Sequence, residues 1–116
     1  MIHLKRVYDP VDPGDGPRFL VDRIWPRGMR KDALKMDAWN KDVAPSPELR
    51  RWFGHDPARW QEFKSRYSSE LDGNHEAWQP LLLAARQGDI TLIYSARDVE
   101  HNNAVVLKAY LEKRIG

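Results

Sequence analysis

The sequence predicts a small α/β fold, in which a short, largely parallel sheet of about three strands is covered by four to five helices. Three observations predict it. Short apolar runs of strand length occur near residues 3–8, 19–24 and 90–94, and helical patterns fill most of residues 46–87 and the segment after residue 98. A long helical connection between two strands is what a parallel pair requires. Without a linker or repeat, residues 1–116 are expected to form a single domain.

The amino-terminal part is expected to supply two strands. Residues 3–8 alternate apolar and basic side chains, which indicates a strand whose direction the pattern leaves open. Residues 9–17 are rich in Pro, Gly and Asp and predict a loop. Residues 19–24 begin with a continuous apolar run, as in a strand covered on both faces, and a Pro-Arg-Gly turn ends it. Residues 29–45 are ambiguous, and a short helix over residues 32–36 is one interpretation.

Capping residues mark the helices. A side-chain oxygen at the residue before a helix accepts a hydrogen bond from an unpaired backbone N–H, and glycine ends many helices. Proline at the first helical position strengthens the signal. The predicted N-caps are Ser46, Asp56, Asn74 and Asp98, with Gly54 and Gly88 ending the first and third helices and the last one running over about residues 99–114.

Composition narrows the functional classes. The 116 residues include 19 Lys+Arg and 17 Asp+Glu, interleaved along the chain, so the net charge of +2 neither demands nor excludes a polyanionic partner. The lack of cysteine excludes disulfides, thiolate catalysis and cysteine-ligated metal clusters. Four scattered histidines predict no metal site, and no cofactor is predicted. No apolar run spans a membrane and no export signal is visible, so a cytoplasmic protein without a membrane partner is expected.

The most informative tract is residues 18–28, where an apolar strand leads directly into charged residues. Charges at the end of a core strand are costly unless they pair or bind something. Ligands of open parallel sheets gather beyond the carboxyl ends of the strands. The second and third predicted strands and the start of the last helix would therefore bring to one edge Asp22, Arg23, Trp25, Arg27, Tyr94, Ser95, Arg97, Asp98, His101, Asn102 and Asn103.

This set predicts a site for a small anionic ligand. Arginine binds phosphate or carboxylate through two parallel hydrogen bonds, and a helix N-terminus favours negative charge. The predicted ligand-binding residues are Arg23, Trp25, Arg27, Tyr94, Ser95, Arg97 and Asn102, with the two aromatic rings as a stacking wall. The predicted catalytic residues are Asp22 and Asp98, which would orient groups or take protons, and His101 as acid–base group.

Structural explanations stay open beside the functional ones. Asp22 is also suited to pair with an arginine such as Arg50 or Arg97, and Asp98 to act only as an N-cap. His55 is interpreted as part of a plain turn between helices, with acid–base catalysis as the less favoured alternative. A nucleophilic Ser95 with His101 and Asp98 is not favoured, because the sequence has no Gly-x-Ser-x-Gly elbow.

Five segments resemble one known family. They are residues 20–28, 44–50, 52–56, 91–98 and 101–104, in order along nearly the whole chain. Together they resemble the YeaO-like family of uncharacterised bacterial proteins, DUF488. The resemblance implies an α/β fold and no assigned activity.

Three functions therefore stay open, and with them whether the protein is an enzyme. The first is a protein with an anion- or nucleotide-type pocket at the strand ends, either binding only or acting as a hydrolase or transferase. The second is a nucleic-acid-binding or regulatory module without catalysis, which the pI near 9.0 favours. The third is a structural or interaction protein. The oligomeric state is not predicted.

Overall fold

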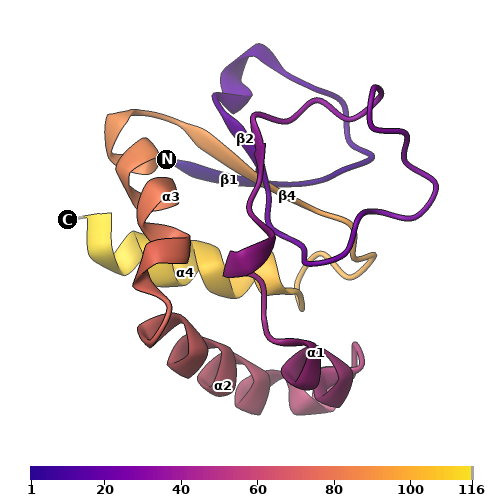
Figure 1. Ribbon diagram of the computed structural model, residues 1–116, viewed down its shortest axis with the longest axis vertical. Coiled ribbons are helices and arrows are strands. Elements are labelled where there is room, and N and C mark those ends of the chain that lie inside the picture. The colour runs from indigo at the N-terminus through magenta and orange to yellow at the C-terminus, as the bar shows by residue number, and fades with distance from the viewer. Residues whose placement is uncertain (116) are drawn as a thin grey trace.

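The computed structural model describes residues 1–115 and is built around a four-stranded sheet in the order β1-β4-β2-β3 (Figure 1). Every pair of neighbouring strands is parallel, which also settles the direction of the first strand. The α/β class and the parallel sheet are thus confirmed, with one strand more than expected. The strands are β1 (Ile2–Arg6), β2 (Arg18–Leu20), β3 (Ala38–Trp39) and β4 (Ile90–Tyr94).

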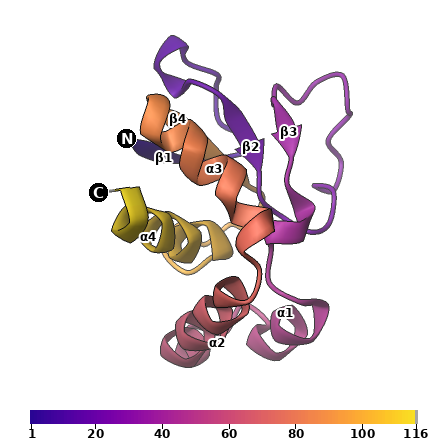
Figure 2. The ribbon, with the colours of Figure 1, turned by 60° about the vertical axis from the view of Figure 1, so that its left-hand side comes forward.

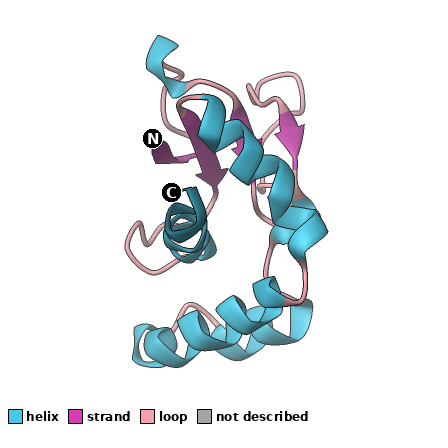
Figure 3. Cartoon of the chain, turned by 90° about the vertical axis from the view of Figure 1, so that its left-hand side faces the viewer, coloured by secondary structure: helices cyan, strands magenta, loops and turns pink. Residues whose placement is uncertain are grey.

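The helices lie on one face of the sheet. α4 (Asn103–Ile115) packs on β1 and β4, with α3 (His75–Gln87) beside it. α1 (Pro47–Phe53) and α2 (Trp60–Asp72) pack together at the end of the molecule away from the strands (Figure 3). Within residues 1–115, no helix is long and apolar enough to cross a membrane.

Strand β4 is the centre of the sheet and is buried on both faces. Leu92 and Tyr94 belong to the core under the helices, whereas Ile93 belongs to a second apolar cluster on the opposite face. All five residues of β4 are buried. A strand covered on both sides reads as a continuous apolar run, which explains why this segment is so easily recognised in the sequence.

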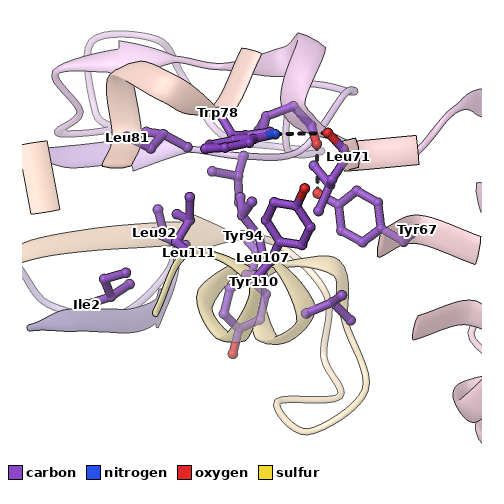
Figure 4. Packing of buried hydrophobic residues seen from close by; sticks show 14 of the residues in the cluster. Ile2, Tyr67, Leu71, Trp78, Leu81, Leu92, Tyr94, Leu107, Tyr110 and Leu111 are labelled. Carbon is purple, nitrogen blue, oxygen red and sulfur yellow. Dashed lines mark hydrogen bonds between the residues drawn. The ribbon is translucent and has the colours of Figure 1, made fainter. Parts of the chain in front are cut away.

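The helical core is rich in aromatic residues whose polar atoms are hydrogen-bonded (Figure 4). Trp78 Nε1 donates to the carbonyl of Leu71 at 2.9 Å, and the Tyr67 hydroxyl donates to the carbonyl of Val43 at 2.7 Å. Such bonds offset the cost of burying an indole or a phenol. The bond to Val43 also ties α2 to the segment immediately before Ala44 and Pro45, which line the cavity described below.

Loops, rather than helices, cover the other face of the sheet. Figure 2 shows the long connection that leaves β2 and returns to form β3. Leu34 in this connection is buried against Leu20 and Ile93. Under the preceding loop, Asp15 and Arg18 form a buried ion pair at 2.5 Å. The two loops thus close this face with apolar packing at one place and paired charges at the other.

Two predicted strand ends and one helix considered from the sequence differ from the structure, each for a local reason. β1 ends at Arg6 instead of residue 8, because the carbonyl of Arg6 accepts from Asp9 N–H in a turn. β2 ends at Leu20 instead of residue 24, because the chain leaves the ladder after Val21 N–H donates to Ile93. The helix considered over residues 32–36 does not form, since Leu34 is drawn to the sheet instead.

Candidate functional site

The two internal strands β2 and β4 end side by side, and the residues after them are cross-linked. Leu20 lies opposite Ile93 in the parallel ladder. The Asp22 carboxylate then accepts hydrogen bonds from both the backbone N–H and the hydroxyl of Ser95, each at 2.9 Å. The predicted meeting of the two strand ends is therefore what the chain adopts, although Asp22 bonds to a serine and not to an arginine as the structural alternative had it.

A cavity of about 660 Å³ opens at this edge of the sheet. Eight of the ten residues predicted for the site line it, and they come from the segments after β2 and β4 and from the start of α4. The lining residues are Asp22, Arg23, Ile24, Trp25, Arg27, Ala44, Pro45, Arg50, Phe53, His55, Phe63, Ser95, Ala96, Arg97, Asp98, Asn102 and Asn103.

The four arginines of the lining are not neutralised by neighbouring carboxylates. Within residues 1–115, Arg23, Arg27, Arg50 and Arg97 form no ion pair at 4.0 Å or less. Arg23 is fixed instead by backbone carbonyls, donating to Ala44 and Pro45 at 3.1 Å each. Four guanidinium groups face two carboxylates in one cavity, so its lining carries an excess of positive charge.

The two carboxylates of the cavity differ in their environment. Burial raises the pKa of Asp22 above its ordinary value, although hydrogen bonds from Ser95 act in the opposite direction. The backbone N–H of Glu100 lowers the pKa of Asp98, with a further contribution from His101. Asp22 is thus the carboxyl that holds a proton more readily, while Asp98 is held in its charged form.

Trp25 supplies the aromatic wall of the cavity. Its indole Nε1 donates to the carbonyl of Met29 at 2.7 Å, and its ring meets Trp39 edge-on with centroids 5.3 Å apart. Trp39 in turn donates to the carbonyl of Asp22 at 2.7 Å. These contacts fix the orientation of Trp25 next to the polar residues at the ends of the strands.

The start of α4 is anchored at the same edge by two asparagines. The Asn102 side-chain oxygen accepts from Val105 N–H at 3.1 Å, which makes it the N-cap of α4. Asn103 donates to the carbonyl of Val21 at 2.9 Å. The prediction that Asp98 caps a helix beginning at Val99 is therefore wrong: Asp98 caps the turn before α4, accepting from the N–H groups of residues 100 and 101.

Two predicted site residues, Tyr94 and His101, do not line the cavity. Tyr94 shares the helical face of β4 with Leu92 and is buried in the core. His101 Nδ1 lies 2.8 Å from the Asp98 carboxylate, and its ring meets the Trp60 ring edge-on at 5.1 Å. Because the Ser95 hydroxyl donates to Asp22, the unfavoured serine–histidine arrangement is not formed.

Three polar lining residues lie outside the predicted set of ten: Arg50, His55 and Asn103. The first two come from α1 and the turn after it. No spacing in the sequence indicates that this short helix reaches the strand ends, so their position depends on the tertiary fold. The sequence places Asn103 at the same sheet edge, but its residue type alone indicates no specific role.

Possible metal ligands in the described part of the chain include its His, Asp and Glu side chains. Within the described residues 1–115, no three His, Asp or Glu side chains are grouped so that they could hold a metal ion. The polar groups that line the cavity are four guanidinium groups, two carboxylates, a serine hydroxyl, an imidazole and two side-chain amides.

Comparison with known proteins identifies the family. A family model described as "Inactive DUF488-N3 subclade" matches residues 1–116. The "Uncharacterized protein Rv3073c" of Mycobacterium tuberculosis is 44% identical over 113 residues, covering 97% of this chain and 95% of the relative. The "Uncharacterized protein YeaO" of Escherichia coli is 41% identical over 110 residues, covering 95% and 96%. No solved structure gives a significant match. None of these names assigns an activity, and the chain belongs to the YeaO-like DUF488 family.

Proposed function

We propose that the cavity binds a small anionic molecule of the nucleotide type, without converting it to a product. The observation that carries this proposal is the set of four cavity arginines, which have no carboxylate within 4.0 Å in residues 1–115. Guanidinium groups bind phosphate or carboxylate through paired, charge-assisted hydrogen bonds. A bound anion would supply the negative charge that the protein itself does not bring to these arginines.

The size and the wall of the cavity support a ligand larger than an inorganic ion. Pockets for small molecules commonly enclose about 300–1,000 Å³, and this cavity measures about 660 Å³. Trp25 offers an aromatic surface for a planar ring, and Asp22 and Ser95 offer polar groups beside it. An anion joined to a ring, as in a nucleoside monophosphate, matches all three features.

Binding without turnover is favoured by two observations. The matching family model is described as inactive. In addition, the Ser95 hydroxyl is bonded to Asp22, and His101, which does not line the cavity, is bonded to Asp98. In this proposal Asp22 and Asp98 orient the ligand and the loop, and the catalytic roles predicted for them and for His101 are not needed.

The proposal is tested by calorimetric titration of the protein with AMP, inorganic phosphate and uncharged adenosine. We expect AMP to bind most tightly, phosphate weakly and adenosine least. Arg97→Gln should weaken AMP binding by about tenfold or more, since a charge-assisted hydrogen bond contributes about 1.5–3 kcal/mol. Arg51→Gln is the matched control, because Arg51 is exposed on α1 and lies outside the cavity.

Two results would contradict the proposal. One is the absence of binding by both anionic probes, and the other is an equal effect of Arg97→Gln and Arg51→Gln. Binding of duplex or single-stranded DNA that falls steeply with salt and is not displaced by AMP would favour the nucleic-acid-binding alternative instead.

We also infer that the protein acts in the cytoplasm. Phosphorylated small molecules are charged and cross the apolar interior of a membrane poorly, so they stay in the cytoplasm where they are made. A protein that binds them is expected in the same compartment. Fractionation of cells that express a tagged protein checks this inference. Recovery in the membrane or extracellular fraction would contradict it.

A further inference from the structure

We propose that His55 is a ligand-binding residue of this cavity, which it lines together with Asp22 and where its backbone adopts a left-handed conformation. The inference rests on the proposed function and deepens it, because it names a second side of the site. It also narrows the ligand to one that carries hydroxyl or amino groups as well as an anion.

The backbone at His55 is unusual within the described chain. Among residues 1–115, His55 is the one residue other than glycine with a positive φ, at 56°. Gly54 before it has a φ of 53° and ends α1 by donating to the carbonyl of Arg50 at 3.1 Å. For a residue with a β-carbon this conformation costs about 1–2 kcal/mol relative to glycine. Strain of this kind is found most often at functional sites.

The turn does not need an imidazole for its own stability. The next residue, Asp56, caps the following 3₁₀ turn by accepting from Ala58 N–H at 3.0 Å. Within residues 1–115, the His55 ring forms no hydrogen bond, and no carboxylate lies within 4.0 Å of it. Its aromatic neighbour is Phe53, with ring centroids 6.3 Å apart. A bound ligand would explain why His55 keeps this costly conformation, since its ring makes no hydrogen bond within residues 1–115.

His55 and Asp22 line the same cavity, and no hydrogen bond or ion pair joins them among residues 1–115, so both side chains can bond to a ligand there. Burial raises the pKa of Asp22, and hydrogen bonds from Ser95 and Asn103, with a smaller electrostatic effect of His55, act in the opposite direction. A hydroxyl or amino group in the cavity would donate to the carboxylate and bond to the imidazole. The sugar of a nucleotide carries such groups, whereas inorganic phosphate binds through the arginines alone.

Two variants separate the imidazole from the strain. His55→Gly removes both and should raise the Tm by about 2–5 °C, because glycine adopts a positive φ freely. His55→Ala removes the ring but keeps the strain, so its Tm should not rise. Both variants should weaken AMP binding by about threefold to tenfold and leave the affinity for inorganic phosphate unchanged, as measured by calorimetric titration.

The outcomes distinguish the two proposals. One outcome is that Arg97→Gln binds AMP more weakly than the wild type, whereas both His55 variants bind AMP as tightly as the wild type. The role proposed for His55 is then wrong, and the proposal that the cavity binds a nucleotide stands. If phosphate binding falls together with AMP binding in the His55 variants, the imidazole contacts the anion and the assignment to the sugar side is wrong. If neither probe binds the wild type, the proposed function and this inference are both overturned.

Discussion

Replacing Asp15 by asparagine tests how strongly the buried ion cluster holds the loop over β1 and β2. The Asp15 carboxylate is only 6% exposed and meets Arg18 Nη1 at 2.5 Å and Lys5 Nζ at 2.7 Å. Burial alone would raise the pKa of Asp15. Hydrogen bonds from Lys5, the backbone of Asp12 and Arg18 together outweigh burial and lower the pKa to about 2.

The size of the effect follows from proton linkage. A carboxyl with a pKa of 3.8 in the unfolded chain and about 2 in the folded protein stabilises the fold by about 2.5 kcal/mol at neutral pH. Because the pKa is depressed by folding, this stabilisation is present above about pH 4 and is lost as the pH falls through 2. Asp15→Asn also leaves the buried Arg18 without its partner, so the loss at pH 7 should reach about 2–4 kcal/mol.

Urea unfolding of the wild type and Asp15→Asn at pH 7 and pH 3 measures this directly. The difference in unfolding free energy should shrink by about 1 kcal/mol at pH 3, since the contribution of Asp15 has by then partly been lost. Asp12→Asn is the matched control: Asp12 pairs with Lys5 at 2.6 Å but is 66% exposed, so its loss should stay under about 1 kcal/mol. A loss for Asp15→Asn that matches the control, or one that is independent of pH, would refute the reasoning.

Two further predictions concern local packing. Gly16→Ala should lower the unfolding free energy, measured by urea unfolding, by more than about 2 kcal/mol. The reason is that φ of Gly16 is 62° and an added β-carbon would lie 1.9 Å from the backbone oxygen of Asp89. Gly14→Ala, which has open space around it, is the control, and equal losses would contradict the packing argument. Burial, helped by the hydrogen bond to Asp72, raises the pKa of Tyr110 to about 12. The contribution of Tyr110 to the stability of the fold is therefore complete below pH 10 and is lost as the pH rises through 12. When the wild type and Tyr110→Phe are titrated with base, the difference between their phenolate absorbances is the signal of Tyr110. This difference should appear only near pH 12, and its appearance near pH 10 would contradict the raised pKa of Tyr110.

The strands of the sheet could be predicted from the sequence where they are buried on both faces, because such strands are continuously apolar. β4 is covered on both faces and therefore reads as five consecutive apolar or uncharged residues. β3, by contrast, is only Ala38–Trp39, too short to show any period. Its place in the sheet comes from pairing with β2, which is information that the local sequence does not hold.

The helix caps show a second limit. Asp98 and Asn102 are both good capping residues, and both act as caps in the structure, at a turn and at α4. The sequence identifies the residue types but does not say which of two caps four residues apart begins the helix. That choice depends on the side chain of Asn103, which reaches the carbonyl of Val21 across the sheet edge.

The site was predictable to the extent that it lies on the strand ends. Parallel topology alone brings Asp22 and Ser95 together, and the bond between them follows. Tyr94 lies two residues after Leu92 in β4, so strand alternation places its side chain on the same face, in the helical core and not in the cavity. Arg50 and His55 reach the cavity through the packing of α1, for which the sequence has no local signal.

The central position of β4 has a consequence for how this chain folds during synthesis. β1 and β2 both pair with β4, and the pairing of Ile2 with Ile90 joins residues that are 88 positions apart in the sequence. Until β4 leaves the ribosome, the first strand has no partner in the sheet, and its unpaired backbone is open to association with other chains. Folding is therefore expected to be late and slow, limited by long-range contacts, and chains that stop before residue 90 should be targets for chaperones.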